Sequence, residues 1–229
     1  GMAETLDIGD PPIRVLIKKS ARARRFSLRI SNVDGAVSLT MPKRAALRDA
    51  VAFAQDHDGW MRKHLGKRPD QIVPTFGGSI LLDGLDVPIT LGTGRKVQFE
   101  AGVLYVPGTE AQVPAKLRAF YKTLARDRLA EASERYAGLV GRRFSRITLR
   151  DTRSRWGSCT SDGNLMYSWR LIMAPRAVQD YVAAHEVCHL VEMNHSDAYW
   201  RQVAAVFPDY KAQRSWLKRN GQQLHRYQF

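Results

Sequence analysis

The chain has 229 residues, of which 44% are hydrophobic, and this predicts an ordinary globular protein of one large or two small domains. Its formal net charge of +14 at pH 7 favours acidic or polyanionic partners, or belongs to a basic surface that contacts only water. No apolar stretch approaches the roughly eighteen residues that span a bilayer, which excludes a transmembrane helix, and we expect no membrane partner.

Cys159 and Cys188 are the two cysteines of the chain, too few for a disulfide framework in a protein of this size. Residues 1–10 contain no apolar segment of the kind found in signal peptides. Both features predict a reducing, cytoplasmic setting.

The first half of the chain is predicted to be rich in β-strands. Short apolar runs indicate strands at Ile13–Lys18, Phe26–Ser31, Ala36–Met41, Ser79–Leu82, Val87–Leu91, Lys96–Glu100 and Val103–Val106. Asn-Val-Asp-Gly at residues 32–35 predicts a hairpin turn, and the apolar spacing over Arg44–Gly66 predicts a helix. Pro107 and Gly108 mark the expected domain boundary, so residues 1–107 form a β-rich N-terminal module.

The second half, residues 108–229, is predicted to be mainly helical around a few strands. The expected elements are a helix over Val113–Ala137, a strand over Arg146–Arg150, a polar segment over Arg153–Thr160, a strand over Leu165–Met173, a helix from Pro175 to Met193, and final helices near Ser196–Val206 and Pro208–Gly221. Pro175 suits the first turn of its helix, and Ser196 suits an N-cap. The chain is therefore expected to belong to the α+β class.

The helix that ends near Met193 carries the pattern His185-Glu186-x-x-His189. Two histidines four residues apart lie on one helix face and can bind one Zn²⁺, while Glu186 lies beside the metal, where a general base for water belongs. Apolar neighbours surround this helix, which predicts a buried central position. Buried histidines and a glutamate need partners, and a zinc ion would provide one for all three.

His195 is the predicted third zinc ligand, because Asn194 before it tolerates the left-handed turn that ends a helix. The spacing matches the H-E-x-x-H-x-x-G-x-x-H pattern of metzincins, with Glu192 in the place of the glycine. A downstream glutamate ligand is excluded, since no glutamate follows Glu192. Asp197, Asp209 and His225 remain as alternatives to His195.

Several segments of the second half together resemble the YgjP-like zinc metallopeptidases, a family related to the WLM and SprT-like metalloproteases. These segments are Arg155–Cys159, Trp169–Leu171, Tyr181–Glu186, Asn194–Ser196 and Tyr199–Trp200, within a stretch from about Leu149 to Leu217. The resemblance implies a zincin-type peptidase domain with His185, His189 and His195 on zinc and Glu186 as the catalytic acid and base. Tyr199 stands where many members have phenylalanine.

Other residues are candidates for contacting the substrate, a peptide or protein. Tyr199 is the first candidate for a second oxyanion donor, with Tyr167 and Arg155 as competitors. Arg155 could instead pair with an acidic neighbour such as Asp151. Leu165–Arg170 is expected to border the cleft and to offer its free edge to an extended substrate. Trp156, Trp169 and Cys188 are expected to pack rather than to react.

Three functions are compatible with these features. The first is a zinc endopeptidase with Glu186 as general base. The second is a basic nucleic-acid-associated protein that acts on or near DNA, for which salt-dependent binding would be diagnostic. The third is a zinc-bound scaffold without hydrolysis, whose metal site peptides cannot reach.

Overall fold

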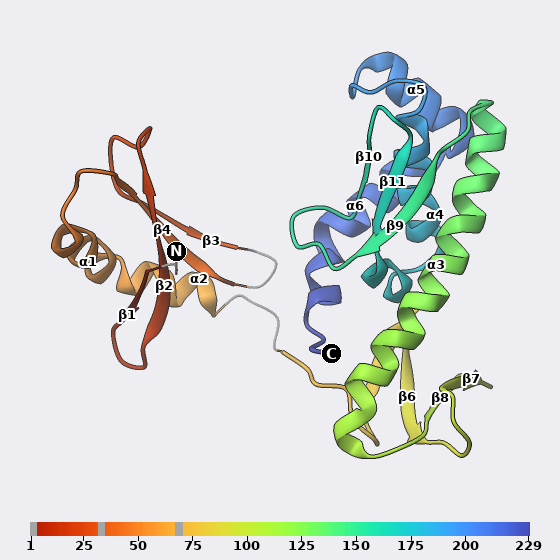
Figure 1. The fold of residues 1–229 in the computed structure, drawn as a ribbon, viewed down its shortest axis with the longest axis horizontal. Coiled ribbons are helices and arrows are strands. Elements are labelled where there is room, and N and C mark those ends of the chain that lie inside the picture. Colours follow the sequence, from red (N-terminus) through yellow and green to blue (C-terminus); the bar gives the residue numbers. More distant parts are fainter. Residues whose placement is uncertain (1–3, 32–34, 67–70) are drawn as a thin grey trace. The chain divides into compact units, whose positions relative to one another are not determined.

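The computed structural model describes residues 4–31, 35–66 and 71–229, which form two compact units, 1–70 and 71–229 (Figure 1). The mixed α+β class predicted from the sequence is confirmed. The second unit begins at Gln71, so the boundary expected at Pro107–Gly108 lies inside it. Among the described helices none is long and apolar enough to cross a membrane.

The first unit is a four-stranded sheet with two helices, in the order β1-β2-β4-β3. Its elements are β1 (Thr5–Ile8), β2 (Ile13–Ser20), β3 (Ser27–Ile30), β4 (Val37–Pro42), α1 (Leu47–Asp56) and α2 (Asp58–Leu65). Alternate residues Val15, Leu39 and Met41 are fully buried against Ala50 and Met61 of the helices.

The hairpin and the helix predicted in this unit have different outcomes. β3 pairs antiparallel with β4, as a hairpin requires, while residues 32–34 of the predicted turn lie outside the described residues. The single helix predicted over Arg44–Gly66 is wrong, because the chain leaves helical geometry at His57, where φ is −101° and ψ is 12°. Two shorter helices result.

The second unit begins with a sheet that shares its core with a long helix. The sheet has the order β5-β6-β8-β7, and its elements are β5 (Ser79–Leu82), β6 (Leu85–Leu91), β7 (Gln98–Glu100) and β8 (Val103–Val106). After η1 (Glu110–Gln112), helix α3 (Val113–Val140) packs Leu117 and Tyr121 into the same buried cluster as Ile80 and Leu104. This shared core explains why no domain boundary falls between sheet and helix.

A second sheet in this unit has the order β10-β11-β9. Strand β11 (Asn164–Ser168) lies in the centre, parallel to β9 (Arg146–Arg150) and antiparallel to β10 (Gly157–Cys159). The strand predicted over Leu165–Met173 therefore ends at Ser168, where the 3-10 helix η2 (Trp169–Met173) begins. The expected free edge at Leu165–Arg170 is also wrong, because both sides of β11 are paired. The edge strands of this sheet are β10 and β9, each of which pairs only with β11 among the described residues.

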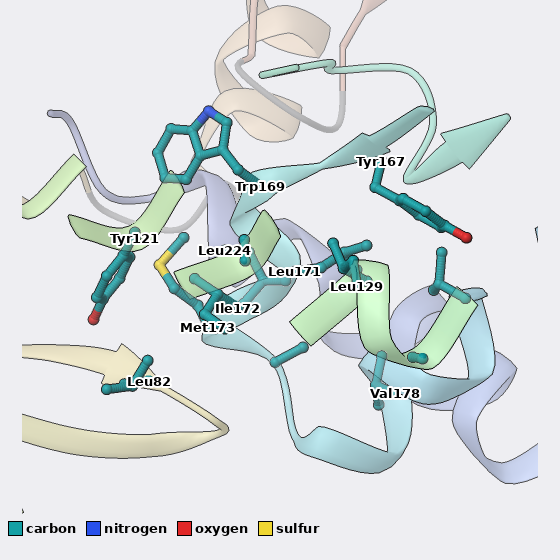
Figure 2. Packing of buried hydrophobic residues seen from close by; sticks show 14 of the residues in the cluster. Leu82, Tyr121, Leu129, Tyr167, Trp169, Leu171, Ile172, Met173, Val178 and Leu224 are labelled. Carbon is teal, nitrogen blue, oxygen red and sulfur yellow. The ribbon is translucent and has the colours of Figure 1, made fainter. Parts of the chain in front are cut away.

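Helices α3 and α4 (Arg176–Cys188) enclose the core of the second unit together with η2 (Figure 2). Tyr167, Trp169 and Leu171 are almost completely buried there, and the Tyr167 hydroxyl lies 2.8 Å from Ser133 Oγ. The chain ends with α5 (Asp197–Val206), α6 (Tyr210–Asn220) and η3 (Gly221–His225). Trp169 is thus a packing residue, as predicted.

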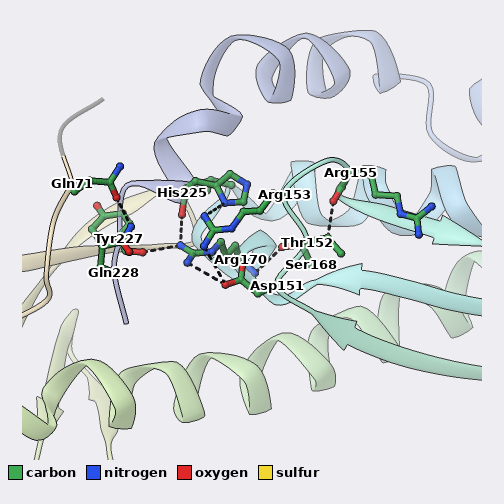
Figure 3. A network of polar contacts seen from close by, with 11 residues as sticks. Gln71, Asp151, Thr152, Arg153, Arg155, Ser168, Arg170, His225, Tyr227 and Gln228 are labelled. Atoms are coloured by element: carbon green, nitrogen blue, oxygen red, sulfur yellow. Dashed lines mark hydrogen bonds and ion pairs between the residues drawn. The ribbon is translucent and has the colours of Figure 1, made fainter. Parts of the chain in front are cut away.

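The guanidinium group of Arg170 connects the strands to the C-terminal segment (Figure 3). Arg170 is 2% exposed and donates hydrogen bonds to Asp151 Oδ1 at 2.7 Å and to the carbonyl oxygens of Leu224 at 2.8 Å and Tyr227 at 3.0 Å. Burial opposes ionisation of Asp151, but Arg170 outweighs it and lowers the pKa of this carboxyl group.

We expect Arg170→Met to reduce the free energy of unfolding by roughly 2–4 kcal/mol, because it removes the hydrogen bonds of Arg170 to Asp151 and to the carbonyl oxygens of Leu224 and Tyr227. Arg153→Met is the matched control, since its ion pair with Asp151 at 3.6 Å is about one-third exposed on both sides and should contribute less than about 1 kcal/mol. Urea unfolding of both variants measures the difference. Equal losses would contradict a special role for Arg170.

Candidate metal centre

The end of α4 and the loop after it bring three histidines together. His185 lies in the last turn of α4, His189 is its C-cap, and His195 lies just before α5, which Ser196 caps by accepting a hydrogen bond from the Tyr199 N–H. Their ligand nitrogens all lie within 4.8 Å of one another. Asp197, Asp209 and His225 are not part of this cluster.

The loop reaches His195 without the left-handed turn predicted at Asn194. Among the described residues only Asp83 and Ala101 combine a side chain with positive φ, so that prediction is wrong. The chain leaves the helix through tight turns instead, since the N–H groups of Leu190 and Val191 donate to carbonyls three residues earlier. A glycine is therefore not needed at Glu192.

The spacing of the nitrogens is suited to a metal ion. Nε2 of His189 lies 3.0 Å from Nε2 of His195. Nitrogens bound to one tetrahedral zinc at about 2.0–2.1 Å are roughly 3.3 Å apart, so small ring movements would be enough to admit the ion. Three imidazoles suit zinc and its neighbours among the transition metals rather than magnesium or calcium, which prefer oxygen ligands.

Contacts on the outer side of the rings orient them. Nδ1 of His189 donates to the carbonyl oxygen of Glu192 at 3.0 Å, which leaves the Nε2 lone pair facing His195. Nδ1 of His185 lies 3.2 Å from the Tyr181 hydroxyl. Burial, together with the nearby His189 and His195, lowers the pKa of His185 to about 3. Neutral imidazole is the form that binds a metal ion.

Glu186 lies beside the cluster in the wall of a cavity of about 330 Å³. Residues lining this cavity include Arg155, Gly157, Tyr181, His185, Glu186 and Arg214. Glu186 is 6% exposed, and burial raises the pKa of its carboxyl group to about 8, against the opposing effect of Arg155. A buried carboxyl group next to three imidazoles can exchange protons with water in the cavity.

Gly157 keeps β10 close to this carboxylate. A Cβ atom at Gly157 would lie 2.9 Å from Glu186 Oε2, closer than Cβ contacts in proteins, and 3.0 Å from the Met166 carbonyl oxygen, which is tighter than most of them. A side chain at residue 157 would therefore push the Glu186 carboxylate or the strand away from its present position.

We expect Gly157→Ala to lower the rate of any reaction that depends on Glu186 about 10–100-fold while metal content stays the same, because the added methyl group displaces Glu186. Gly138→Ala in α3 is the control, since its Cβ would meet nothing within 4 Å. Rates and bound metal are measured on both proteins. An unchanged rate in Gly157→Ala would show that the position of Glu186 does not matter.

Tyr199 and Tyr167 do not line the cavity. Tyr199 is completely buried, its hydroxyl donates to the His185 carbonyl oxygen at 2.8 Å, and its ring stacks on His189 at 4.4 Å. Tyr167 is buried against Ser133, and burial raises its pKa. The structure therefore brings neither hydroxyl to the place where an oxyanion donor is needed.

Arg155 does line the cavity. The expected pairing with Asp151 is not made, because Asp151 forms its ion pairs with Arg170 and Arg153. No salt bridge of Arg155 occurs among residues 4–31, 35–66 and 71–229. Trp156 packs as predicted, since its ring stacks on His225 at 4.9 Å.

Tyr181 and Arg214 are among the lining residues that the sequence analysis did not single out. Tyr181 lies one helical turn before His185, so helical spacing could have identified it. Arg214 comes from α6, far along the chain, and its guanidinium lies over the Trp200 ring at 4.7 Å. Nothing in the local sequence indicated that α6 would return to the cavity.

Three converging imidazoles and a buried carboxylate are the components of a metal-dependent hydrolase. The family model described as YgjP-like, metallopeptidase domain, matches residues 24–220, and the chain belongs to this family. A solved structure, the metallopeptidase zymogen of Pyrococcus abyssi abylysin, has 20% sequence identity and a TM-score of 0.36, covering 39% of this chain and 93% of its own. No curated protein matches the sequence.

Proposed function

We propose that the protein is a zinc-dependent peptidase with a zincin-like catalytic centre, in which His185, His189 and His195 hold the ion and Glu186 is the general base and acid. The observation that carries this proposal is the convergence of three imidazoles with a buried carboxylate in one cavity. Zinc bound there would supply Lewis acidity to a peptide carbonyl and lower the pKa of water toward about 7.

The chain's own residues perform the remaining steps. Glu186 accepts a proton from the attacking water and passes it to the leaving amine. Arg155, without an ion-pair partner, is placed to hold a carbonyl or carboxylate of the substrate. The ring of Tyr199 stacks on the ring of His189 and holds this ligand in position. This positioning role takes the place of the oxyanion role that the sequence position of Tyr199 suggested.

The free edge of β10 is the proposed place for an extended substrate. Ser168 N–H donates to the Trp156 carbonyl at 2.9 Å, and Thr160 N–H donates to the Asn164 carbonyl at 3.0 Å. In an antiparallel ladder the residues between these pairs, Gly157 and Cys159, direct their main-chain groups away from the partner strand. A substrate strand can pair with them beside Glu186.

Metal removal tests the proposal directly. Protein treated with a strong chelator and dialysed is expected to lose at least about 99% of its hydrolysis of a casein substrate, since three imidazoles alone supply no Lewis acid. Adding one equivalent of zinc should restore it, whereas magnesium should not, because imidazoles bind it poorly. Full activity of verified metal-free protein would contradict the proposal.

A further inference from the structure

The second sheet has an outer face opposite the one that packs on α3 and α4. Ile147 and Leu149 of β9 pack against the core, so the alternate residues Arg146, Thr148 and Arg150 face the other way. This outer face is hollowed by a cavity of about 260 Å³. Its rim carries Arg146, Arg150 and Arg155 together with hydroxyl groups of Thr148, Ser158 and Thr160.

The hollow carries uncompensated positive charge. No aspartate or glutamate lines it. Arg146, Arg150 and Arg155 form no salt bridge within the described parts of the chain, whereas the nearby Arg153 and Arg170 both pair with Asp151. Three guanidinium groups that form no salt bridge, of which Arg155 also acts on the charge of Glu186, make with the hydroxyl donors between them a site for carboxylate or similar anions.

The hollow continues the proposed substrate groove. Arg155 lines both this hollow and the cavity at Glu186. Ser158 lies across from Met166, which lies across from Thr148, so the three strands form one continuous surface. A substrate strand paired with β10 would extend that surface and direct every second side chain, about 6.6–6.8 Å apart, to the side of the arginines.

We propose that this hollow is a subsite for acidic side chains, so that the preferred substrates are peptide segments with aspartate or glutamate at alternate positions next to the cleaved bond. Its role in selecting substrates rests on the proposed peptidase function, but binding itself does not. The hollow suits an acidic peptide better than a nucleic acid strand, because no aromatic side chain lines it to stack with bases.

The test measures binding to zinc-loaded Glu186→Gln protein, in which turnover is blocked. Two fluorescent decapeptides differ only in having glutamate or glutamine at alternate positions, and anisotropy gives their Kd values. The glutamate peptide is expected to bind at least about tenfold more tightly. Arg146→Gln/Arg150→Gln should remove that preference, while the charge-matched control Arg142→Gln/Arg143→Gln, outside the hollow, should keep it.

Equal binding of both peptides, or equal losses in both double variants, would overturn the proposal. So would a labelled oligo-dT that binds more tightly than the glutamate peptide and depends on Arg146 and Arg150, which would assign the hollow to nucleic acid. Hydrolysis of the glutamine peptide by the wild-type protein is measured separately. Its absence would count against the peptidase function and leave the binding result interpretable.

Discussion

Replacing Glu186 by glutamine is expected to abolish peptide hydrolysis, by about 10³-fold or more, and to leave about one zinc per chain. Glutamine has nearly the shape of glutamate but cannot accept a proton from water, and proton transfer of this kind contributes roughly 10²–10⁴-fold. Metal binding should persist because the ligand cluster consists of the three histidines. Initial rates and metal analysis on the same preparation measure both quantities.

Glu192→Gln is the matched control for this variant. It changes a glutamate close to the same site, but Glu192 contacts His189 through its main-chain carbonyl, which the substitution retains. Its side chain does not line the cavity. Activity retained in Glu186→Gln would remove the general base from the mechanism. Activity lost equally in Glu192→Gln would mean that the loop, and not one carboxylate, governs the rate.

Local patterns predicted most of the elements. Short apolar runs predicted β2 and β4, whose residues Val15 and Leu39 are buried, and helical spacing predicted α3 through Leu117 and Tyr121. Strand β10 escaped because Gly157–Cys159 is short and carries no apolar alternation. Its strand character comes from pairing with β11, an interaction that local sequence does not encode.

Nonlocal packing also explains the wrong topology at the cleft. Leu165–Ser168 has the composition of a strand, but composition does not tell a central strand from an edge strand. The boundary predicted at Pro107–Gly108 also depended on local sequence alone. Pro107 and Gly108 are turn residues, but the sheet before them and the helix after them share one core.

The candidate site was predictable where spacing determines it. His185, Glu186 and His189 follow from the helical repeat, and the cluster includes His195 rather than Asp197, Asp209 or His225. The roles predicted for Tyr199 and Tyr167 toward the substrate required exposed hydroxyl groups, and the sequence gives little information on the exposure of a single side chain. Tyr199 and Tyr167 are among the largest fully buried side chains of the protein, and each hydroxyl has an internal partner.

The two alternatives to a peptidase were a zinc-bound scaffold and a nucleic-acid-associated protein. A scaffold would require a metal site out of reach, yet His195 is exposed and the neighbouring cavity is lined by exposed residues such as Arg155 and Lys218. Nucleic-acid association has no support from the family match, which is to a metallopeptidase domain. The basic charge is accounted for more simply if part of it recognises acidic peptides.

His195→Ala is expected to lower zinc affinity more than about 100-fold, so that dialysed protein retains less than about 0.1 zinc per chain. Removing one of three ligands should cost at least as much as removing an outer-shell partner, which costs roughly 10–100-fold. The fold should survive, because His195 is exposed in a loop and α5 keeps its cap at Ser196. Metal content and affinity from competition with a zinc-binding dye measure the effect.

Asp197→Asn and Asp209→Asn are the controls, since both were possible ligands from sequence and neither belongs to the cluster. Both should keep about one zinc per chain and full hydrolysis. If zinc is retained in His195→Ala but lost in one of the controls, that aspartate and not His195 is the third ligand. Of the three proposed ligands only His195 lies beyond the α4 helical repeat, so this comparison tests whether the loop after α4 completes the metal site.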